Sequence, residues 1–191
     1  VSPPGGDLSD PVVQATLRMV KVFWSLEDKL AYQRHFPAIS WLRSYSLYVD
    51  NIAEHLAQKV AKDFISNRAF AIKLLQQESS LEEIVRLVGV DALSESDKLV
   101  METAKSLRED FLHQNAFDPE DTYCALDKQY KLFGLILHFH NERQEVIKKD
   151  GKLKTHTEIK EKIARLKYAK LTELDTKILE IKEQIKENER S

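Results

Sequence analysis

The stretch VGVDALSESDKL, residues 88–99, joins two segments whose apolar residues recur at helical spacing. Gly89 is the residue type that most often ends a helix, and Ser94 and Asp97 have the spacing of a capping box at the start of the next one. The turn carries three acidic and two apolar residues: Asp91, Glu95, Asp97, Val90 and Leu93. The stretch therefore predicts two helices folded back on each other, with a charged turn at their common end.

Helical spacing extends from this turn in both directions. Downstream, SESDKLVMETAKSLREDFLHQ places four apolar residues on one face: Val100, Ala104, Leu107 and Phe111. Upstream, one helix is expected over residues 50–77 and a second one from Ser80. The inward face of this second helix is expected to comprise Leu81, Ile84, Val85 and Val88.

The last 70 residues divide into two segments of different character. A helix over about residues 123–149 contains YKLFGLILHF, which is apolar nearly all round, so we expect it to be the central buried helix. Asp150 and Gly151 end it. Residues 152–191 are charged but carry an apolar seam at 3-4-3-4 spacing: Leu171, Leu174, Ile178, Ile181 and Ile185. This seam predicts burial against one partner helix.

The N-terminal 48 residues follow no single period. VSPPGGDLSDP, residues 1–11, looks like a loop taken from something larger. TLRMVKVFWSL, residues 16–26, fits a helix or a strand equally well. EDKLAYQRH, residues 27–35, is short and helix-compatible, and Pro37 stops it.

Composition excludes several classes of protein. Hydrophobic residues make up 42% of the 191 residues and charged residues 31%, which is typical of a globular, helix-rich chain. A net charge of -2 argues against a nucleic-acid binder, which usually carries a clear basic surplus. Cys124 stands alone, so no disulfide can form within the chain and a reducing, cytoplasmic setting is expected. No stretch approaches the roughly 20 apolar residues that span a bilayer, so direct membrane insertion is not expected.

Local sequence marks no catalytic or metal-binding residue. His138 and His140 are two residues apart on the expected central helix, so they face different ways and are poorly placed to share a metal ion. No phosphate-binding G-x-x-x-x-G-K-[ST] loop occurs among these residues, and no nucleophile–base pair is apparent. Three aromatic residues on expected loops have two interpretations: Phe36, Phe117 and Tyr123. They either plug the core or form a stacking slot for a flat ring.

The turn and its flanks resemble a known family. IVRLVGVDALSESDKLVMETAKSLREDFLHQNAF is similar to the C-terminal domain of rotary ATPase catalytic subunits, whose F-type beta subunit carries an acidic DELSEED loop, a helix and then a QPF turn. Three further segments resemble the catalytic A subunit of V-type or archaeal A-type ATPases: DPVVQATLRMVKVFW, LAYQRHFPAISWLRSYSLYVD and NAFDPEDTYCALDKQYKLFGLILHFH. The resemblance is strong over residues 3–150 and weaker over the tail.

The resemblance implies a mainly α fold. Residues 1–48 would be a short remnant of the nucleotide-binding α/β domain, with residues 16–26 as about its last strand. Residues 49–150 would form a helical bundle, whose turn at residues 88–97 faces the rotor. Residues 151–191 would be a charged helical extension.

The resemblance also assigns site residues. Phe36, just before Pro37, and the pair Phe117 and Tyr123, six apart, fit the family's adenine-holding aromatics. Rotor contact falls to Val90, Asp91, Leu93, Glu95 and Asp97. Three acids stand where the F-type loop has five, so we expect this turn to transmit motion by shape more than by charge.

The function implied is that of the C-terminal part of a catalytic subunit that couples nucleotide-dependent closure to rotation of the central stalk. The intact subunit would bind ATP or ADP with magnesium, alternate with non-catalytic B subunits in a hexamer, and lie peripheral to the membrane. These 191 residues alone should bind no cofactor and be inactive, because aromatic stacking by itself supplies at most a few kcal/mol. The alternative is a freestanding helical scaffold that uses the seam of residues 171–185 to grip another protein's helix.

Overall fold

The structure is a computed structural model that describes residues 7–190, without the side chains of residues 189 and 190. Helices dominate it, and a pair of two-residue strands lies near the N-terminus. The elements are, in order, α1(Pro11–Met19), β1(Val22–Phe23), α2(Asp28–Tyr32), β2(Tyr45–Ser46), α3(Val49–Lys59), α4(Phe64–Val88), the 3-10 helix η2(Val90–Ala92), α5(Glu95–Ser106), the π-helix η3(Leu107–Leu112), α6(Pro119–Thr122), α7(Leu126–Asp150), α8(Thr157–Arg165), the 3-10 helix η4(Leu166–Tyr168) and α9(Leu171–Arg190).

The helical hairpin predicted around residues 88–99 is present as α4 and α5, which pack against each other. Gly89 ends α4 with a φ of 86°, a value that residues with a side chain rarely adopt. α5 begins at Ser94, whose Oγ accepts a hydrogen bond from the Asp97 N–H at 3.1 Å and donates one to the Asp97 carboxylate at 2.6 Å. Both predicted ends of the turn are confirmed.

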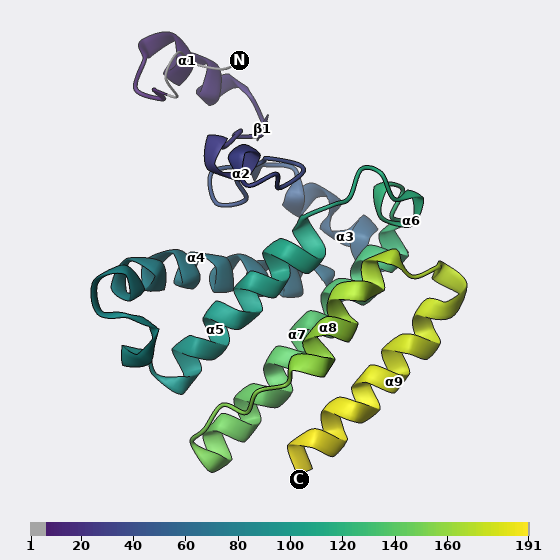
Figure 1. The fold of residues 1–191 in the computed structure, drawn as a ribbon. Coiled ribbons are helices and arrows are strands. Elements are labelled where there is room, and N and C mark those ends of the chain that lie inside the picture. The colour runs from purple at the N-terminus through teal and green to yellow at the C-terminus, as the bar shows by residue number, and fades with distance from the viewer. Residues whose placement is uncertain (1–6, 191) are drawn as a thin grey trace.

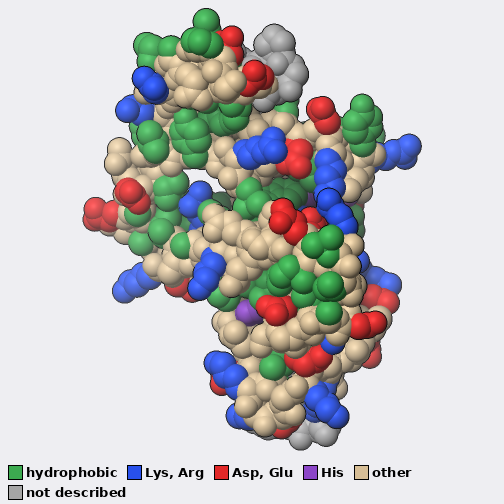
Figure 2. All heavy atoms as spheres, turned by 90° about the vertical axis from the view of Figure 1, so that its left-hand side faces the viewer, with side chains coloured by type: hydrophobic (Ala, Val, Ile, Leu, Met, Phe, Trp, Pro, Cys, Tyr) green, Lys and Arg blue, Asp and Glu red, His purple; other side chains and the backbone are tan. Residues whose placement is uncertain are grey.

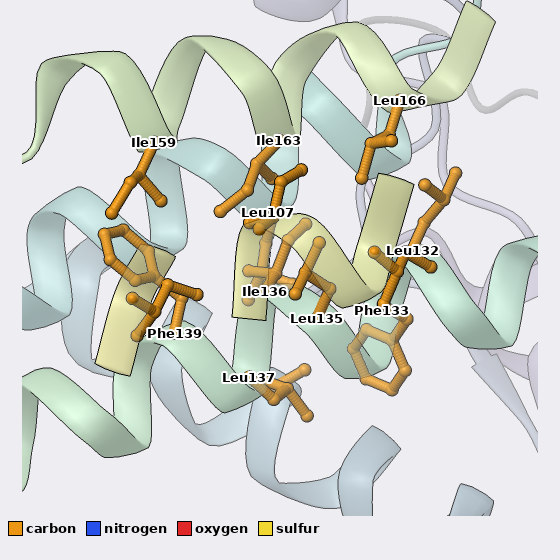
Figure 3. Close-up of a cluster of buried hydrophobic side chains, with 14 of the residues drawn as sticks. Leu107, Leu132, Phe133, Leu135, Ile136, Leu137, Phe139, Ile159, Ile163 and Leu166 are labelled. Atoms are coloured by element: carbon orange, nitrogen blue, oxygen red, sulfur yellow. The ribbon is translucent and has the colours of Figure 1, made fainter. Parts of the chain in front are cut away.

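α7 is the central helix, as predicted. It contacts α4, α5, α8 and α9, and these elements surround it in Figure 1. Figure 3 shows side chains of α7, α8, η3 and η4 pointing toward one another in one apolar cluster. The labelled members are Leu107, Leu132, Phe133, Leu135, Ile136, Leu137, Phe139, Ile159, Ile163 and Leu166. The α5 face predicted to point inward joins this cluster, with Ala104 and Leu107 buried and Val100 and Phe111 packed against it.

The tail belongs to the same core. Along α9 the apolar seam is buried at Leu174, Ile178, Ile181 and Ile185, whereas Leu171 is exposed. The helix that covers the seam is α7 of this same chain, together with α8. Residues 49–150 and 151–191 thus share one apolar cluster, and the seam is not available to grip another protein.

The helices differ from the sequence-based prediction in three respects. Residues 50–77 do not form one helix, because α3 ends at Lys59 and α4 begins at Phe64. No break occurs at Ser80, because α4 runs unbroken through it and the Ser80 hydroxyl donates a hydrogen bond to the Gln76 carbonyl one turn back. The expected inward residues at the end of α4 are also wrong in part, since Ile84 and Val88 are exposed. Pro119 starts a short helix, α6, whose N-cap is Asp118.

The ambiguous segment of residues 16–26 proves to be both helix and strand. Its first part completes α1, and its second part contains β1, which pairs antiparallel with β2 so that Val22 faces Ser46. A further bridge joins Leu26 to Ile39. Assigning the whole segment to a strand was therefore wrong for residues 16–19, which are helical. Four apolar side chains of this region are left exposed: Met19, Val22, Trp24 and Leu26.

Candidate functional site

The loop of residues 113–123, which lies between η3 and α7 and contains α6, carries two of the predicted adenine-site aromatics and is called the adenine loop below. Buried Asp121 folds the loop back on itself, because its carboxylate accepts a hydrogen bond from the Asn115 N–H at 2.6 Å. The Thr122 hydroxyl donates to the Asn115 carbonyl at 2.9 Å. Asp118 caps α6 by accepting from the N–H groups of Glu120 and Asp121. These bonds are local and mutually consistent, so the loop has a defined shape.

The aromatic side chains on and beside this loop point into solvent. Phe117 is 98% exposed, Tyr123 85% and Phe36 54%. None of the three stacks on another aromatic ring in the part of the chain that the structure describes. None of the three side chains is therefore buried in the core of the residues that the structure describes. Rings bared in this way have free faces for a flat ligand.

Phe36 lies next to this loop through its backbone. The Phe36 carbonyl accepts a hydrogen bond from the Gln114 N–H at 2.7 Å. One residue earlier, the His35 ring nitrogens lie 3.2 Å from the Pro37 carbonyl oxygen and 3.0 Å from that of Arg108 in η3. The His35 ring also stacks on His113 at 4.9 Å between centroids. The two segments that the sequence assigned separately to one pocket are thus brought together.

A small cavity of about 220 Å³ lies under this junction. Its lining includes Pro37, Gln114, Asp121 and Cys124. Pockets that enclose a whole drug-sized ligand usually measure about 300–1,000 Å³. The cavity is therefore too small to enclose a nucleotide. Burial raises the pKa of the Cys124 thiol, which keeps it protonated and inert at neutral pH.

The turn of residues 88–97 lies at the opposite side of the bundle from α6 (Figure 1). Its five predicted contact residues are not equivalent. Val90 and Asp91 are exposed, and Glu95 and Asp97 are partly so. Leu93 is buried, because η2 turns its side chain inward, and it offers no surface to a partner in this structure. The sequence-based assignment of Leu93 as a surface contact residue is therefore corrected.

Two of the acids in the turn already have intramolecular partners. Asp97 is part of the α5 cap. Glu95 forms an ion pair with Lys98 at 2.8 Å and accepts a hydrogen bond from the Leu153 N–H at 3.0 Å. These two bonds, that from Lys98 being the stronger, hold the pKa of Glu95 below its usual range. Asp91 is the one exposed acid of the three.

Exposed apolar side chains at the end of α4 extend this surface. Leu87 and Val88 at the end of α4 are exposed, next to exposed Val90. Figure 2 views the molecule from this side and shows hydrophobic side chains grouped in the middle of the face, with acidic ones beside them. We call Leu87, Val88 and Val90 the apolar tip. The sequence signal for the apolar tip was a run of apolar residues that continues past the last buried turn of α4.

His140 of α7 has a structural partner. His140 is buried, and its Nδ1 lies 2.8 Å from the Thr103 hydroxyl, which itself donates to the Leu99 carbonyl. Burial lowers the pKa of His140 to about 4, so it is neutral at physiological pH. Within residues 7–190, no three His, Cys, Asp or Glu side chains are placed to share a metal ion. Across the same range, no helix combines the length and apolar character needed to cross a membrane.

Two known protein families match most of this chain. The family described as the C-terminal domain of V and A type ATP synthase matches residues 53–157, which is more than half of the chain. The chain belongs to the V- and A-type ATP synthase family. The ATP synthase alpha/beta family nucleotide-binding domain matches residues 1–46 in addition. The first match ends shortly before α3, and the second begins within α3.

Relatives of this V- and A-type ATP synthase chain are much longer than it is. The V-type ATP synthase alpha chain of Clostridium botulinum (strain Okra) is 58% identical over 88% of this chain and 29% of its own length. That of Thermoanaerobacter pseudethanolicus is 54% identical over 97% of this chain and 32% of its own. An ATP synthase subunit, NeqB from Nanoarcheaum equitans, shares the fold with a TM-score of 0.60 and 23% identity over 72% of this chain and 32% of that one. The chain spans about three tenths of its relatives' length.

Proposed function

We propose that this chain is the C-terminal part of the catalytic subunit of a V- or A-type ATP synthase, where it completes the adenine pocket and couples domain closure to rotation of the central stalk. The observation that carries the proposal is the meeting of Phe36 with the Phe117–Tyr123 loop, at a site where all three rings are bare. Base–aromatic stacking accepts such free ring faces without any further contact. The proposal that the flat ligand is the adenine of ATP or ADP rests on family membership.

The phosphate groups and magnesium would be held by other parts of the subunit, since these residues contain no phosphate-binding loop. The exposed apolar side chains of the N-terminal segment would lie under the rest of the nucleotide-binding domain. Neighbouring B subunits would complete an alternating hexamer. The assembled enzyme would be cytoplasmic, peripheral to the membrane, and would move protons or sodium ions during ATP synthesis or hydrolysis.

The apolar tip would meet the rotor. Leu87, Val88 and Val90 present bulk without charge, and Asp91 adds one exposed carboxylate. Closure around the nucleotide would move the tip as part of a rigid body, because α5 and η3 form a continuous run of helix from the tip to the adenine loop. Contact by shape is favoured over charge, since two of the three acids are already bonded within the chain.

The test of the adenine pocket uses the full-length subunit in the assembled enzyme. Replacing Phe117→Ala or Tyr123→Ala should raise the KM for ATP by about 5- to 100-fold, because each stacking contact is worth about 1–3 kcal/mol. Inorganic tripolyphosphate, which lacks a base, should inhibit the variants as well as it inhibits the parent enzyme. An unchanged KM for ATP, or an equal loss of tripolyphosphate binding, would contradict the assignment.

The scaffold alternative has no supporting observation. It required the seam of residues 171–185 to be free for another protein, and four of its five side chains are buried against α7 and α8.

A further inference from the structure

Lys128, near the start of α7, is a buried cation satisfied by backbone alone. Its side chain is 2% exposed, and its Nζ donates to three carbonyl oxygens, those of Glu120 at 2.8 Å, Lys167 at 2.7 Å and Ala169 at 2.8 Å. A lysine ammonium has three N–H donors, so each one has an acceptor. Glu120 belongs to α6, at the end of the adenine loop, whereas Lys167 and Ala169 belong to η4 and its C-cap.

Lys167 makes the matching connection at the other end of that loop. Its side chain is 8% exposed, and its Nζ donates to the carbonyls of Glu109 at 3.0 Å and His113 at 3.1 Å. These carbonyls lie at the C-terminal end of η3, where a cation also suits the helix dipole. Both ends of the loop of residues 113–123 are thereby tied to the single turn η4.

Stability alone does not account for these two lysines. Burial of an ammonium group is costly, and apolar replacements at buried charged sites are often neutral or stabilising. A fully satisfied ammonium group fixes the relative position of the segments that it binds, because three carbonyls from two segments must converge on one atom. The three segments that converge around the two ammonium groups are η3, α6 and η4, and η4 lies far along the chain from the other two.

We propose that Lys128 and Lys167 are positioning residues for the adenine loop, so that the C-terminal extension forms part of the support of the nucleotide site. η4 holds the loop at both ends, and the loop presents Phe117 and Tyr123 at a fixed height above the bundle. α8 and α9 anchor η4 in the core through Ile163, Leu166 and Leu174. This proposal rests on the adenine pocket proposed above and adds to it the residues that set its geometry.

The test compares three single variants of the full-length subunit in the assembled enzyme. Lys128→Met and Lys167→Met keep the aliphatic stem and remove the ammonium. Lys131→Met is the matched control, because Lys131 lies one turn along α7 and also ties it to the extension, through Asp175 at 2.9 Å, but does not touch the loop. The first two variants should raise the KM for ATP by about 3- to 30-fold, less than the loss of a stacking ring, with little change in kcat. The control should match the parent.

A double-mutant cycle separates positioning from general damage. In a Phe117→Ala, Tyr123→Ala background, Lys128→Met should raise the KM no further, because the rings through which it acts are gone. Hydrogen exchange at the amides of residues 113–123 should become faster in the 191-residue chain that carries Lys167→Met. This measurement decides the question if the Lys128→Met variant does not fold. An additive KM effect, or an unchanged loop exchange, would overturn the positioning role. An unchanged KM in the Phe117→Ala, Tyr123→Ala parent would instead sink the adenine pocket itself.

Discussion

The Oε2 atom of Glu95 accepts a hydrogen bond from the backbone N–H of Leu153 at 3.0 Å, which joins the start of α5 to the turn that follows α7. The other carboxylate oxygen pairs with Lys98 at 2.8 Å. Glu95 therefore holds two segments of the domain together. Both of its carboxylate oxygens are bonded within the chain, unlike those of Asp91. The structure therefore supports a stabilising role for Glu95 better than a role in rotor contact.

Replacing Glu95→Ala should loosen this junction. We expect faster hydrogen exchange at the Leu153 amide of the 191-residue chain, whereas Asp91→Ala should leave that amide unchanged. The pKa of Glu95 is lowered in the folded state, so its contribution is present above the ordinary carboxyl pKa and is lost as the pH falls through the lowered value. Equal protection of Leu153 in the two variants would show that the bond does not matter.

The apolar tip gives a second prediction, on torque in the assembled enzyme. Asp91→Ala should leave the torque of ATP-driven rotation unchanged, and Leu87→Ser with Val90→Ser should lower it, if contact is made by shape. Asp91 is the appropriate acid for this test, because alanine at Glu95 or Asp97 also removes a bond within the domain. A collapse of torque with Asp91→Ala alone would establish charge as the transmitter.

Burial of the α9 seam gives a third prediction, on stability. Leu174 is 0% exposed and Leu179, on the same helix, is 59% exposed. Leu174→Ala should lower the free energy of unfolding by about 2–5 kcal/mol, because it leaves a cavity in the shared core. Leu179→Ala, the matched control, should change it by no more than about 0.5 kcal/mol. Urea denaturation of the 191-residue chain measures both, and equal effects would contradict a single core.

Glu78 gives a fourth prediction, on the pH dependence of stability. Its side chain is 5% exposed and pairs with Arg108 at 3.0 Å, yet burial outweighs the arginine and raises the pKa of Glu78 to about 7. A raised carboxyl pKa means that the folded state binds the proton more tightly than the unfolded state does. Its contribution is thus most favourable below the ordinary value of 4.5 and is lost as the pH rises through 7.

Glu78→Gln should remove this dependence. The difference in unfolding free energy between variant and parent should shift in favour of the variant by about 2 kcal/mol between pH 5 and pH 8. Glu82→Gln is the matched control, since Glu82 also faces Arg108, at 3.5 Å, but is more exposed. A difference that stays constant across this pH range would contradict the raised pKa.

Local chemistry decided which parts of the fold could be predicted from sequence. Gly89 and Ser94 set their helix ends through their own backbone and side chain, so the hairpin turn was readable. Ser80 misled the helix assignment, because the same hydroxyl that can cap a helix can also bond to the previous turn inside one. Leu93 was misassigned because only the course of η2 determines which way it points.

The support of the candidate site could not be predicted in the same way. The family resemblance assigned Phe36, Phe117 and Tyr123 to the candidate site, and the structure brings their segments together. Lys128 and Lys167 lie in charged stretches that look like ordinary solvated helix surface. Their acceptors are carbonyls 8 to 58 residues away, and no local pattern encodes such contacts.

The uninterrupted run of α5 and η3 has a consequence for angular motion. From residue 95 to residue 112 it spans roughly 25 Å, so a turn of about 6° about the adenine-loop end sweeps the other end through an arc of roughly 2.5 Å. Favourable carbon–carbon contact extends over only about 3.5–4 Å. A reorientation too small to disturb the packing around η3 is therefore large enough to make or break a contact at Val90.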